Sequence, residues 1–358
     1  MCLFNIIIRS ICLLLISSCA GWPAARSGEK SLAVDTKPIP CHSHNDYWRS
    51  VPLFSAIQAG CIGVEADVWL FGDDLYVGHT PHSLSKDRTL KKMYLDPLLD
   101  TLSKQNDAAD FKLDPNGSRK GVFDSAPSQS LVLLIDFKAK GQKIWPHLVS
   151  QLSPLRERGY LTHFNGTNVV ERPVTVVATG KVPFDLVIAD PTYRDIFFDA
   201  PLDKLSAMGT GPHASASTRL NPGDDDIENQ MYAFLEEYWI ESHDPLDPGE
   251  DINSVLERRG KFTPELFDPT NSYYASVSYK KSIGIPWGFR VSKKQVDKIR
   301  EQTRAAHARG LKVRYWATPG WPRALRDRVW TVLVREGADI LNVDDLRGAT
   351  SKRSIWGL

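Results

Sequence analysis

Short apolar runs alternate with amphipathic stretches along most of the chain. Apolar runs of this length, bounded by turn residues, predict strands, whereas apolar residues spaced three and four apart predict helices. The predicted strands cover Pro38–His42, Ile62–Leu70, Leu75–His79, Leu131–Lys138, Val174–Thr179, Leu186–Ala189, Tyr273–Ser278, Leu311–Trp316 and Ala338–Val343. The predicted helices cover Leu53–Ala59, Thr89–Gln105, Ile144–Arg158, the segment from Ser292 to Gly310, and Arg323–Glu336. This alternation, over 358 residues, predicts an α/β fold of the (β/α)8 TIM-barrel type with an inserted loop region.

Acidic side chains fall on one face of two predicted strands. Glu65 and Asp67 alternate with apolar residues, and Asp136 and Lys138 do the same in the strand from Leu131. The apolar faces suit the outer helices, so the acidic residues should point into the barrel near the carboxyl ends of the strands, where barrel enzymes place their sites. Buried like charges need a counter-charge, and oxygen ligands favour Mg2+ or Ca2+. We therefore expect one divalent cation, with structural ion pairs as the alternative.

Two histidines lie at the same predicted rim. His44 belongs to the segment His42–Asp46 at the end of the first strand, and His79 ends the extended piece after the second. A pair of histidines beside an acidic metal site suits proton transfer near neutral pH, one as base and one as acid. Each one alone is more often a structural group than a catalyst.

Four segments resemble, in order, the motifs of the phospholipase C-like phosphodiesterases, a superfamily that includes phosphatidylinositol phospholipase C, glycerophosphodiester phosphodiesterases and sphingomyelinase D enzymes. They are His44–Tyr47, Val64–Trp69, Val77–Thr80 and Leu134–Lys138. The resemblance implies that His44 and His79 are the acid/base pair and that the metal ligands are Asn45, Glu65, Asp67 and Asp136. It leaves open whether water or a substrate hydroxyl attacks phosphorus, the latter releasing a cyclic phosphate.

Within this superfamily, the chain most resembles a mostly fungal family named for altered inheritance of mitochondria (protein 6). The similarity lies in the segments His42–Tyr47, Val64–Leu70, Arg88–Leu90, Phe197–Leu202, Asn271–Ser276, Arg314–Pro319 and Leu341–Leu346. It implies a metal-dependent phosphoric diester hydrolase that acts on a phospholipid or glycerophosphodiester. The insertion between Leu202 and Asn271 looks longer than the family usually carries.

Three further inward residues are candidates for substrate binding. Lys138 could bind a phosphate oxygen, with an ion pair to Asp136 or Glu65 as the alternative. Arg314 and Trp316 share a face of their strand and could flank a ligand, or pack in the barrel core. Asn342 and Asp344 are expected to point inward on the last strand as supporting groups.

Two other functions fit parts of the pattern. A barrel whose site has decayed could bind a lipid or phosphate without catalysis, although all five acidic and histidine residues of the predicted site are present. His42 and His44 also resemble the opening motif of amidohydrolase barrels, which need further histidines at later strand ends. His213 and His243 lie in the insertion and His307 lies on a helix, which disfavours that class.

Composition limits the partners. The formal net charge is +1 and no basic stripe interleaved with aromatic residues is present, which argues against nucleic acid. The expected partner is a phosphodiester small molecule or a lipid headgroup, with peripheral membrane contact left open. We expect a monomer.

The first 20 residues have the pattern of a signal peptide, with Arg9 ahead of an apolar run and small residues at the end. This predicts a secreted or cell-surface protein; an uncleaved membrane anchor or a lipoprotein signal at Cys19 are the alternatives. Residues 21–37 form a leader, 38–348 the barrel with an insertion at 206–268, and 349–358 a tail.

Two cysteines, Cys41 and Cys61, lie in the predicted barrel. A rise of about 3.3 Å per residue places Cys61 roughly 13 Å below the expected metal, whereas Cys41 is expected near the top of the first strand. A disulfide needs Cα atoms within about 7 Å, so both thiols are expected to stay reduced.

Overall fold

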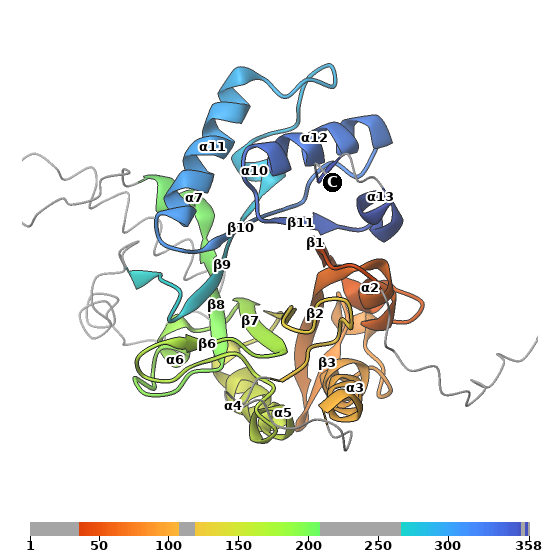
Figure 1. Ribbon diagram of the computed structural model, residues 1–358, viewed down its shortest axis with the longest axis vertical. Helices are drawn as coiled ribbons and strands as arrows, with labels where there is room; N and C mark the ends of the chain where they lie inside the picture. The colour runs from red at the N-terminus through yellow and green to blue at the C-terminus, as the bar shows by residue number, and fades with distance from the viewer. Residues whose placement is uncertain (1–35, 107–118, 208–265, 352–354, 357–358) are drawn as a thin grey trace, which may run out of the picture. The chain divides into compact units, whose positions relative to one another are not determined.

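The computed structural model describes residues 36–106, 119–207, 266–351 and 355–356, and its centre is a closed ring of eight parallel strands (Figure 1). Each strand pairs with the next along the chain, and the last pairs with the first. The ring consists of β1 (Ile39–Ser43), β2 (Cys61–Phe71), β4 (Leu131–Phe137), β7 (Val174–Gly180), β8 (Ile196–Pro201), β9 (Ser272–Ser278), β10 (Lys312–Trp316) and β11 (Ile340–Val343). The predicted TIM barrel is thereby confirmed.

Three strands lie outside this ring. β3 (Asp74–Val77) pairs antiparallel with the end of β2, and β5 (His163–Phe164) pairs with β6 (Val169–Val170) in a separate small sheet. The hairpin of β2 and β3 therefore extends β2 beyond the barrel, toward the rim where His79 follows.

Helices cover the outside of the barrel (Figure 1). They are α2 (Phe54–Ala59), α3 (Asp96–Asn106), α4 (Gly141–Gln151), α5 (Ser153–Glu157), α6 (Phe184–Val187), α7 (Leu202–Ala207), α10 (Tyr279–Ser282), α11 (Lys293–His307), α12 (Arg323–Arg335) and α13 (Leu346–Thr350). Short helical turns occur at η1 (Asp46–Trp48), η2 (Pro81–Ser83) and η3 (Lys91–Leu95). The expected start of α11 is confirmed, because Ser292 and Gln295 form a reciprocal capping box. Among the described helices, none is both long and apolar enough to pass through a bilayer.

One predicted strand is wrong. Residues 186–189 do not form a strand, because Phe184–Val187 is the helical turn α6 and the next barrel strand is β8. A short apolar run cannot be assigned to helix or strand by its periodicity. The strand that the pattern did not assign, Ile196–Pro201, carries Asp199 into the barrel interior, where its side chain meets Arg314.

Alternation of side chains along the strands divides the apolar residues into two layers. Val64, Ala66 and Val68 of β2 belong to the large core between the strands and the helices. A smaller cluster fills the barrel interior and consists of Val132, Leu134, Val177, Tyr274 and Ile340. The inward face that the sequence assigned to β2 and β4 is thereby confirmed, with the acidic side chains lying beyond this inner cluster toward the strand ends.

The expectation that Cys41 and Cys61 stay reduced is wrong. The two residues form a disulfide, with Cα atoms 4.7 Å apart. The sequence pattern predicts both strands in the correct segments, but it does not predict how high one strand lies relative to the other. Ile39 lies beside Cys61, and an irregularity in the register before His42 brings Cys41 close to Cys61 as well. Cys41 is therefore at the middle of β1, on the strand adjacent to Cys61.

Several expectations fall on residues that lie outside the described part of the chain. These are the signal or anchor segment at 1–20, most of the leader, residues 208–265 of the insertion and much of the tail.

Candidate active site

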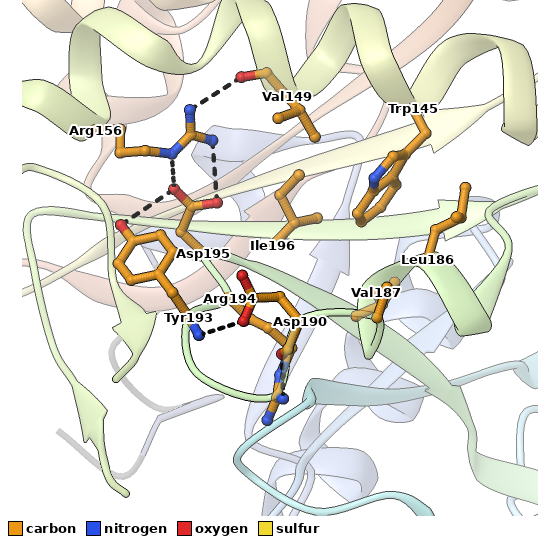
Figure 2. A pocket seen from close by; sticks show the side chains of 11 residues that line it. Trp145, Val149, Arg156, Leu186, Val187, Asp190, Tyr193, Arg194, Asp195 and Ile196 are labelled. Atoms are coloured by element: carbon orange, nitrogen blue, oxygen red, sulfur yellow. Dashed lines mark hydrogen bonds and ion pairs between the residues drawn. The ribbon is translucent and has the colours of Figure 1, made fainter. Parts of the chain in front are cut away.

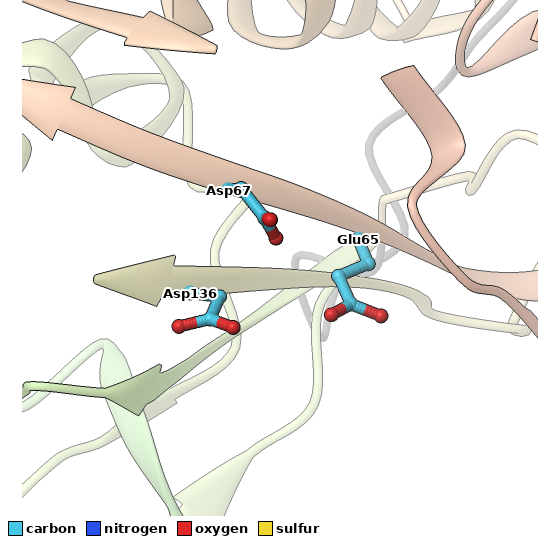
Figure 3. A group of neighbouring side chains, drawn as sticks. All are labelled: Glu65, Asp67 and Asp136. Atoms are coloured by element: carbon cyan, nitrogen blue, oxygen red, sulfur yellow. The ribbon is translucent and has the colours of Figure 1, made fainter. Parts of the chain in front are cut away.

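Three carboxylates from two neighbouring strands converge inside the barrel (Figure 3). Asp67 of β2 and Asp136 of β4 are directly opposite each other in the parallel register, and Glu65 precedes Asp67 by two residues on the same face. One oxygen of each of the three groups lies within 4.8 Å of the others. Glu65 and Asp67 are buried and Asp136 is partly buried. The structure therefore brings together three of the four predicted metal ligands directly.

Two cations lie against this acidic cluster. Lys138 Nζ is 2.5 Å from Asp136 Oδ2 and 3.1 Å from Asp67 Oδ2. Arg314 of β10 lies 3.8 Å from Glu65 Oε2, but it also pairs with Asp199 Oδ2 at 3.2 Å. Four carboxylates thus share two cations, which leaves an excess of two negative charges if all are ionised.

The pKa values of two carboxyl groups in the cluster reflect this excess of negative charge. Burial raises the pKa of Glu65 to about 7, although Arg314 opposes the shift. Burial likewise raises the pKa of Asp136, against the influence of Lys138. Buried carboxylates resist ionisation when their counter-charge is insufficient. A divalent cation would supply the two missing positive charges.

Two buried carboxylate oxygens without hydrogen bonds, and a glycine beside Asp136, support this fit. Glu65 Oε2 and Asp67 Oδ1 are buried and have no hydrogen-bond partner among the described residues. Gly180, at the end of β7, has φ +73°, and a Cβ there would be 2.1 Å from Asp136 Oδ1. Glycine at this position thus keeps the Asp136 carboxylate clear. Unpartnered carboxylate oxygens are suitable ligands for Mg2+ or Ca2+, so the residues present fit a hard divalent cation.

Asn45 joins the cluster through Tyr47. Asn45 has φ 45°, a left-handed conformation that asparagine tolerates better than most residues, and this turn leads into η1. The Tyr47 hydroxyl lies 2.7 Å from Asn45 Oδ1, 2.7 Å from Asp67 Oδ2 and 3.3 Å from His79 Nδ1. A single buried hydroxyl therefore contacts two predicted metal ligands and one predicted catalytic histidine.

Each of the two predicted catalytic histidines is oriented by a carboxylate. His44 Nδ1 lies 2.8 Å from Asp344 Oδ1, and His79 Nδ1 lies 3.2 Å from Asp67 Oδ2. Burial lowers the pKa of His44, but the hydrogen bond to Asp344 and the charge of Glu65 outweigh it and raise the pKa overall. A carboxylate at Nδ1 fixes the ring and its tautomer, which directs Nε2 to a reacting group.

His42 is placed differently from His44. It is fully buried, and its Nε2 lies 3.9 Å from Glu65 Oε2. Burial lowers the pKa of His42 well below its usual value, with Arg314 adding to the effect. A Cβ at Gly63 would be 2.2 Å from His42 Nδ1, so the ring occupies space that only glycine leaves open. His42 is thus a neutral group beneath the cluster.

The three predicted substrate-binding residues occupy distinct environments. Lys138 lies beside the cluster, as described above, with its side chain about one quarter exposed. Arg314 is buried and satisfied by Ser276, Asn342 and Asp199, so its guanidinium faces the protein. Trp316, at the end of β10, is partly exposed at the rim.

The sequence does not predict the contacts of two contributing residues. Tyr47 belongs to one of the motifs, but its contacts depend on η1 folding back over the barrel. The expectation that Asp344 points inward on the last strand is wrong, because Asp344 follows the end of β11 and its side chain is 72% exposed. Its partner His44 lies 300 positions away in the chain. Strand alternation could locate Asp344 at the rim, whereas only the closed ring of strands shows its pairing with His44.

A separate pocket lies away from this site, beside the start of β8 (Figure 2). Its charged groups satisfy one another: Arg156 binds both oxygens of Asp195, and Asp190 accepts hydrogen bonds from Thr192 and from the backbone of Tyr193. None of the predicted site residues lines it. This pocket gives no sign of catalytic chemistry.

The chain is similar to known proteins over most of its length. Residues 30–199, which include β1, β2 and β4, match the family model described as the AIM6-like phosphodiesterase domain. A homologue of altered inheritance of mitochondria protein 6 from Arthroderma benhamiae is 37% identical over 87% of this chain and 83% of its own length. The protein of that name from Eremothecium gossypii is 33% identical over 89% of this chain and 72% of its own length, and that from Saccharomyces cerevisiae strain YJM789 is 30% identical over 88% and 71%.

The fold and the match define a TIM-barrel domain of the phosphodiesterase type. The chain belongs to the altered inheritance of mitochondria protein 6 family.

Proposed function

We propose that the protein is a phosphoric diester hydrolase that uses one hard divalent cation and the histidines His44 and His79. The observation that carries this proposal is the buried group of Glu65, Asp67 and Asp136, with two oxygens that accept no hydrogen bond and with its excess negative charge. The side-chain oxygen of Asn45 would complete an all-oxygen ligand set. The Tyr47 hydroxyl, which also contacts Asp67, holds this oxygen near the cluster. When bound, the cation would polarise the phosphate and neutralise the charge that develops on it.

The two histidines divide the proton transfers in this proposal. His44 and His79 belong to the rim segments that follow β1 and β3, and each holds a carboxylate at Nδ1. With Nδ1 so occupied, Nε2 of one ring takes the proton of the attacking hydroxyl and Nε2 of the other protonates the leaving oxygen. Asp344 favours the protonated form of His44, because their hydrogen bond raises the pKa of His44. We assign His44 as the group that carries the proton to the leaving oxygen.

Lys138 adds positive charge on the β4 side of the cluster. Burial lowers the pKa of its ammonium group, but Asp136 and Asp67 outweigh this and raise the pKa overall, so the side chain remains charged at neutral pH. A fixed cation near the phosphate stabilises charge on a non-bridging oxygen. Arg314, in contrast, is occupied by Asp199, Ser276 and Asn342, and its proposed contribution is to hold Glu65 in place.

The substrate class follows from the site and the family. A diester is proposed because the domain model that matches this chain is of the phosphodiesterase type. We propose a phospholipid or a glycerophosphodiester as this diester. Where the substrate carries a neighbouring hydroxyl, we propose that this hydroxyl attacks first and a cyclic phosphate forms, since an internal attack gains roughly 7–11 kcal/mol over one by bulk water.

Phosphorus NMR tests the proposed activity. The protein is incubated with a panel of lysophospholipids, sphingomyelin and glycerophosphodiesters, and at least one diester should be consumed by the wild type and not by His79→Asn. No turnover of any member, with the divalent cation bound, would favour a binding module instead. Early samples in ¹⁸O-water report the nucleophile: immediate ¹⁸O incorporation into a linear product without a cyclic species would exclude internal attack.

We also propose that the protein passes through an oxidising compartment. The Cys41–Cys61 disulfide supports this, because such bridges persist mainly in secreted and cell-surface proteins. The signal-like segment at 1–20 agrees with it. Protection of the protein from protease in intact membrane fractions, or its recovery from the medium, is the expected observation; a cytosolic fraction with free thiols would contradict it.

A further inference from the structure

Large apolar side chains are exposed mainly on one end of the barrel. Of the ten such side chains in the described part of the chain, eight lie at or just after the carboxyl end of a barrel strand. We define the aromatic rim by six of them: Trp48, Ile285, Trp287, Phe289, Trp316 and Trp321. Only Ile188 and Tyr193 lie before a strand, at the opposite end. Exposed apolar side chains gathered in this way mark a surface that contacts another apolar phase.

The residues of the aromatic rim come from strands that are close together in the ring. Ile285, Trp287 and Phe289 lie between α10 and α11, which follow β9. Trp316 and Trp321 end or follow β10, and Trp48 follows β1. These strands are consecutive in the ring apart from β11, which lies between β10 and β1 (Figure 1). Helices that follow parallel barrel strands begin at the strands' carboxyl end, so the rim segments share the face of the active site.

Tryptophan dominates this surface. Trp287 and Trp321 are 94% and 82% exposed, and four of the ten tryptophans in the sequence belong to the rim. Tryptophan is costly to expose to water and is the side chain enriched at the boundary between lipid and water, because its ring is both apolar and polar.

The charge of the same segment indicates which lipids would be favoured. Residues 279–296 contain five basic residues and no acidic residue. Three of the basic residues, Lys280, Lys281 and Arg290, are exposed, and Arg290 directly follows Phe289. None of the three has an acidic side chain as an ion-pair partner within the described residues. Basic residues at an interface are attracted to anionic headgroups.

The rim also adjoins the catalytic groups. The Trp48 ring lies 5.3 Å from the ring of His79, between their centroids. The His79 side chain is half exposed, so a surface that docks on the rim would lie beside it. A bilayer presents its phosphodiester headgroups in that position.

We propose that the aromatic rim docks the protein on an anionic lipid bilayer with the active site facing the headgroups. The inference deepens the proposed phosphodiesterase function by assigning a membrane-presented substrate, but the docking itself does not require turnover. Trp287 and Trp321 insert at the interface, and the basic residues of 279–296 bind the anionic headgroups. Binding and catalysis can therefore fail separately.

Vesicle partition of the full chain provides the first test. Wild type is expected to bind vesicles of phosphatidylcholine and phosphatidylserine (4:1) more tightly than vesicles of phosphatidylcholine alone. Trp287→Ala/Trp321→Ala should weaken binding by roughly tenfold or more, since burying one large apolar side chain is worth about that factor. Ile188→Ala removes an exposed apolar side chain at the opposite end of the barrel and should bind as the wild type does. Binding that is equal for both vesicle types would overturn the assignment of anionic lipid.

Fluorescence quenching by a brominated phosphatidylcholine in the same vesicles provides the second test, and it reports the rim even if another segment also attaches the chain. Tryptophan emission of the wild type should be quenched, and Trp287→Phe/Trp321→Phe should lose most of that quenching while retaining binding, because phenylalanine keeps an apolar ring. Unchanged quenching in this variant would overturn the proposal. Hydrolysis of a water-soluble diester by the same variants should match the wild type, which separates docking from the proposed activity.

Discussion

Removal of the disulfide between β1 and β2 is the perturbation whose effect on stability can be worked out most directly. The bridge closes a segment with a sequence separation of 20. Loop-closure entropy for about 20 residues is roughly 11 cal/mol/K, which corresponds to about 3.3 kcal/mol at 25 °C. Both cysteines are fully buried, so replacing them by alanine also leaves a small cavity worth about 1 kcal/mol. Cys41→Ala/Cys61→Ala should therefore lower the free energy of unfolding by about 4 kcal/mol.

Urea unfolding followed by circular dichroism measures this loss, and a matched experiment separates its two parts. Reduction of the wild type by dithiothreitol removes the crosslink but keeps both sulfur atoms, so it should cost only about 3 kcal/mol. Over the roughly 250 residues that the structure describes, that is a fall in Tm of roughly 6 °C. The double alanine variant should not respond to dithiothreitol. If the wild type shows two free thiols by mass spectrometry, or an unchanged Tm on reduction, the placement of Cys41 beside Cys61 is contradicted.

Four further substitutions test the site. His44→Asn and His79→Asn should each lower kcat by about 10²–10⁴-fold with little change in Tm, whereas a loss below tenfold would remove that histidine from proton transfer. Tyr47→Phe keeps the buried ring but deletes the hydroxyl shared by the ligands and His79, so kcat should fall by roughly 10-fold or more through a charge-assisted hydrogen bond. Tyr315→Phe, whose buried hydroxyl contacts Gln302 away from the site, is the matched control and should retain kcat. Arg314→Met strips a buried cation from its carboxylate partners and should lower the free energy of unfolding by about 3–5 kcal/mol in thermal or urea denaturation; a loss below 1 kcal/mol would contradict its buried pairing.

Periodicity in the sequence predicts the part of the site that depends on single strands. Glu65, Asp67 and Asp136 could be placed on inward faces because side chains alternate along a strand, and the closed barrel confirms that placement. The same rule separates the outer from the inner apolar layer. The capping box at Ser292 and Gln295 could be read because its hydrogen bonds span only three residues.

Contacts between distant strands could not be predicted in the same way. The cysteine bridge depends on an irregular register between β1 and β2, and the sequence carries no measure of one strand's height relative to another. The pairing of Arg314 with Asp199 depends on β8, whose apolar run was not assigned as a strand. Tyr47 lies near the predicted ligands in sequence, but the three contacts of its hydroxyl arise only when η1 folds over the ends of β2 and β3.

The proposed function depends most on the buried acidic cluster, which is proposed to hold one divalent cation for phosphodiester cleavage. The most direct measurement is the hydrolysis rate of a diester substrate after removal of metal by a chelator and dialysis, followed by titration with Mg2+ or Ca2+. The activity of the wild type should be lost on chelation and should return as the ion is added, with saturation at one ion per chain. Asp67→Asn removes the negative charge at the centre of the cluster, so the same ion concentration should not restore its activity. Full activity of the wild type in excess chelator would contradict the proposed metal site.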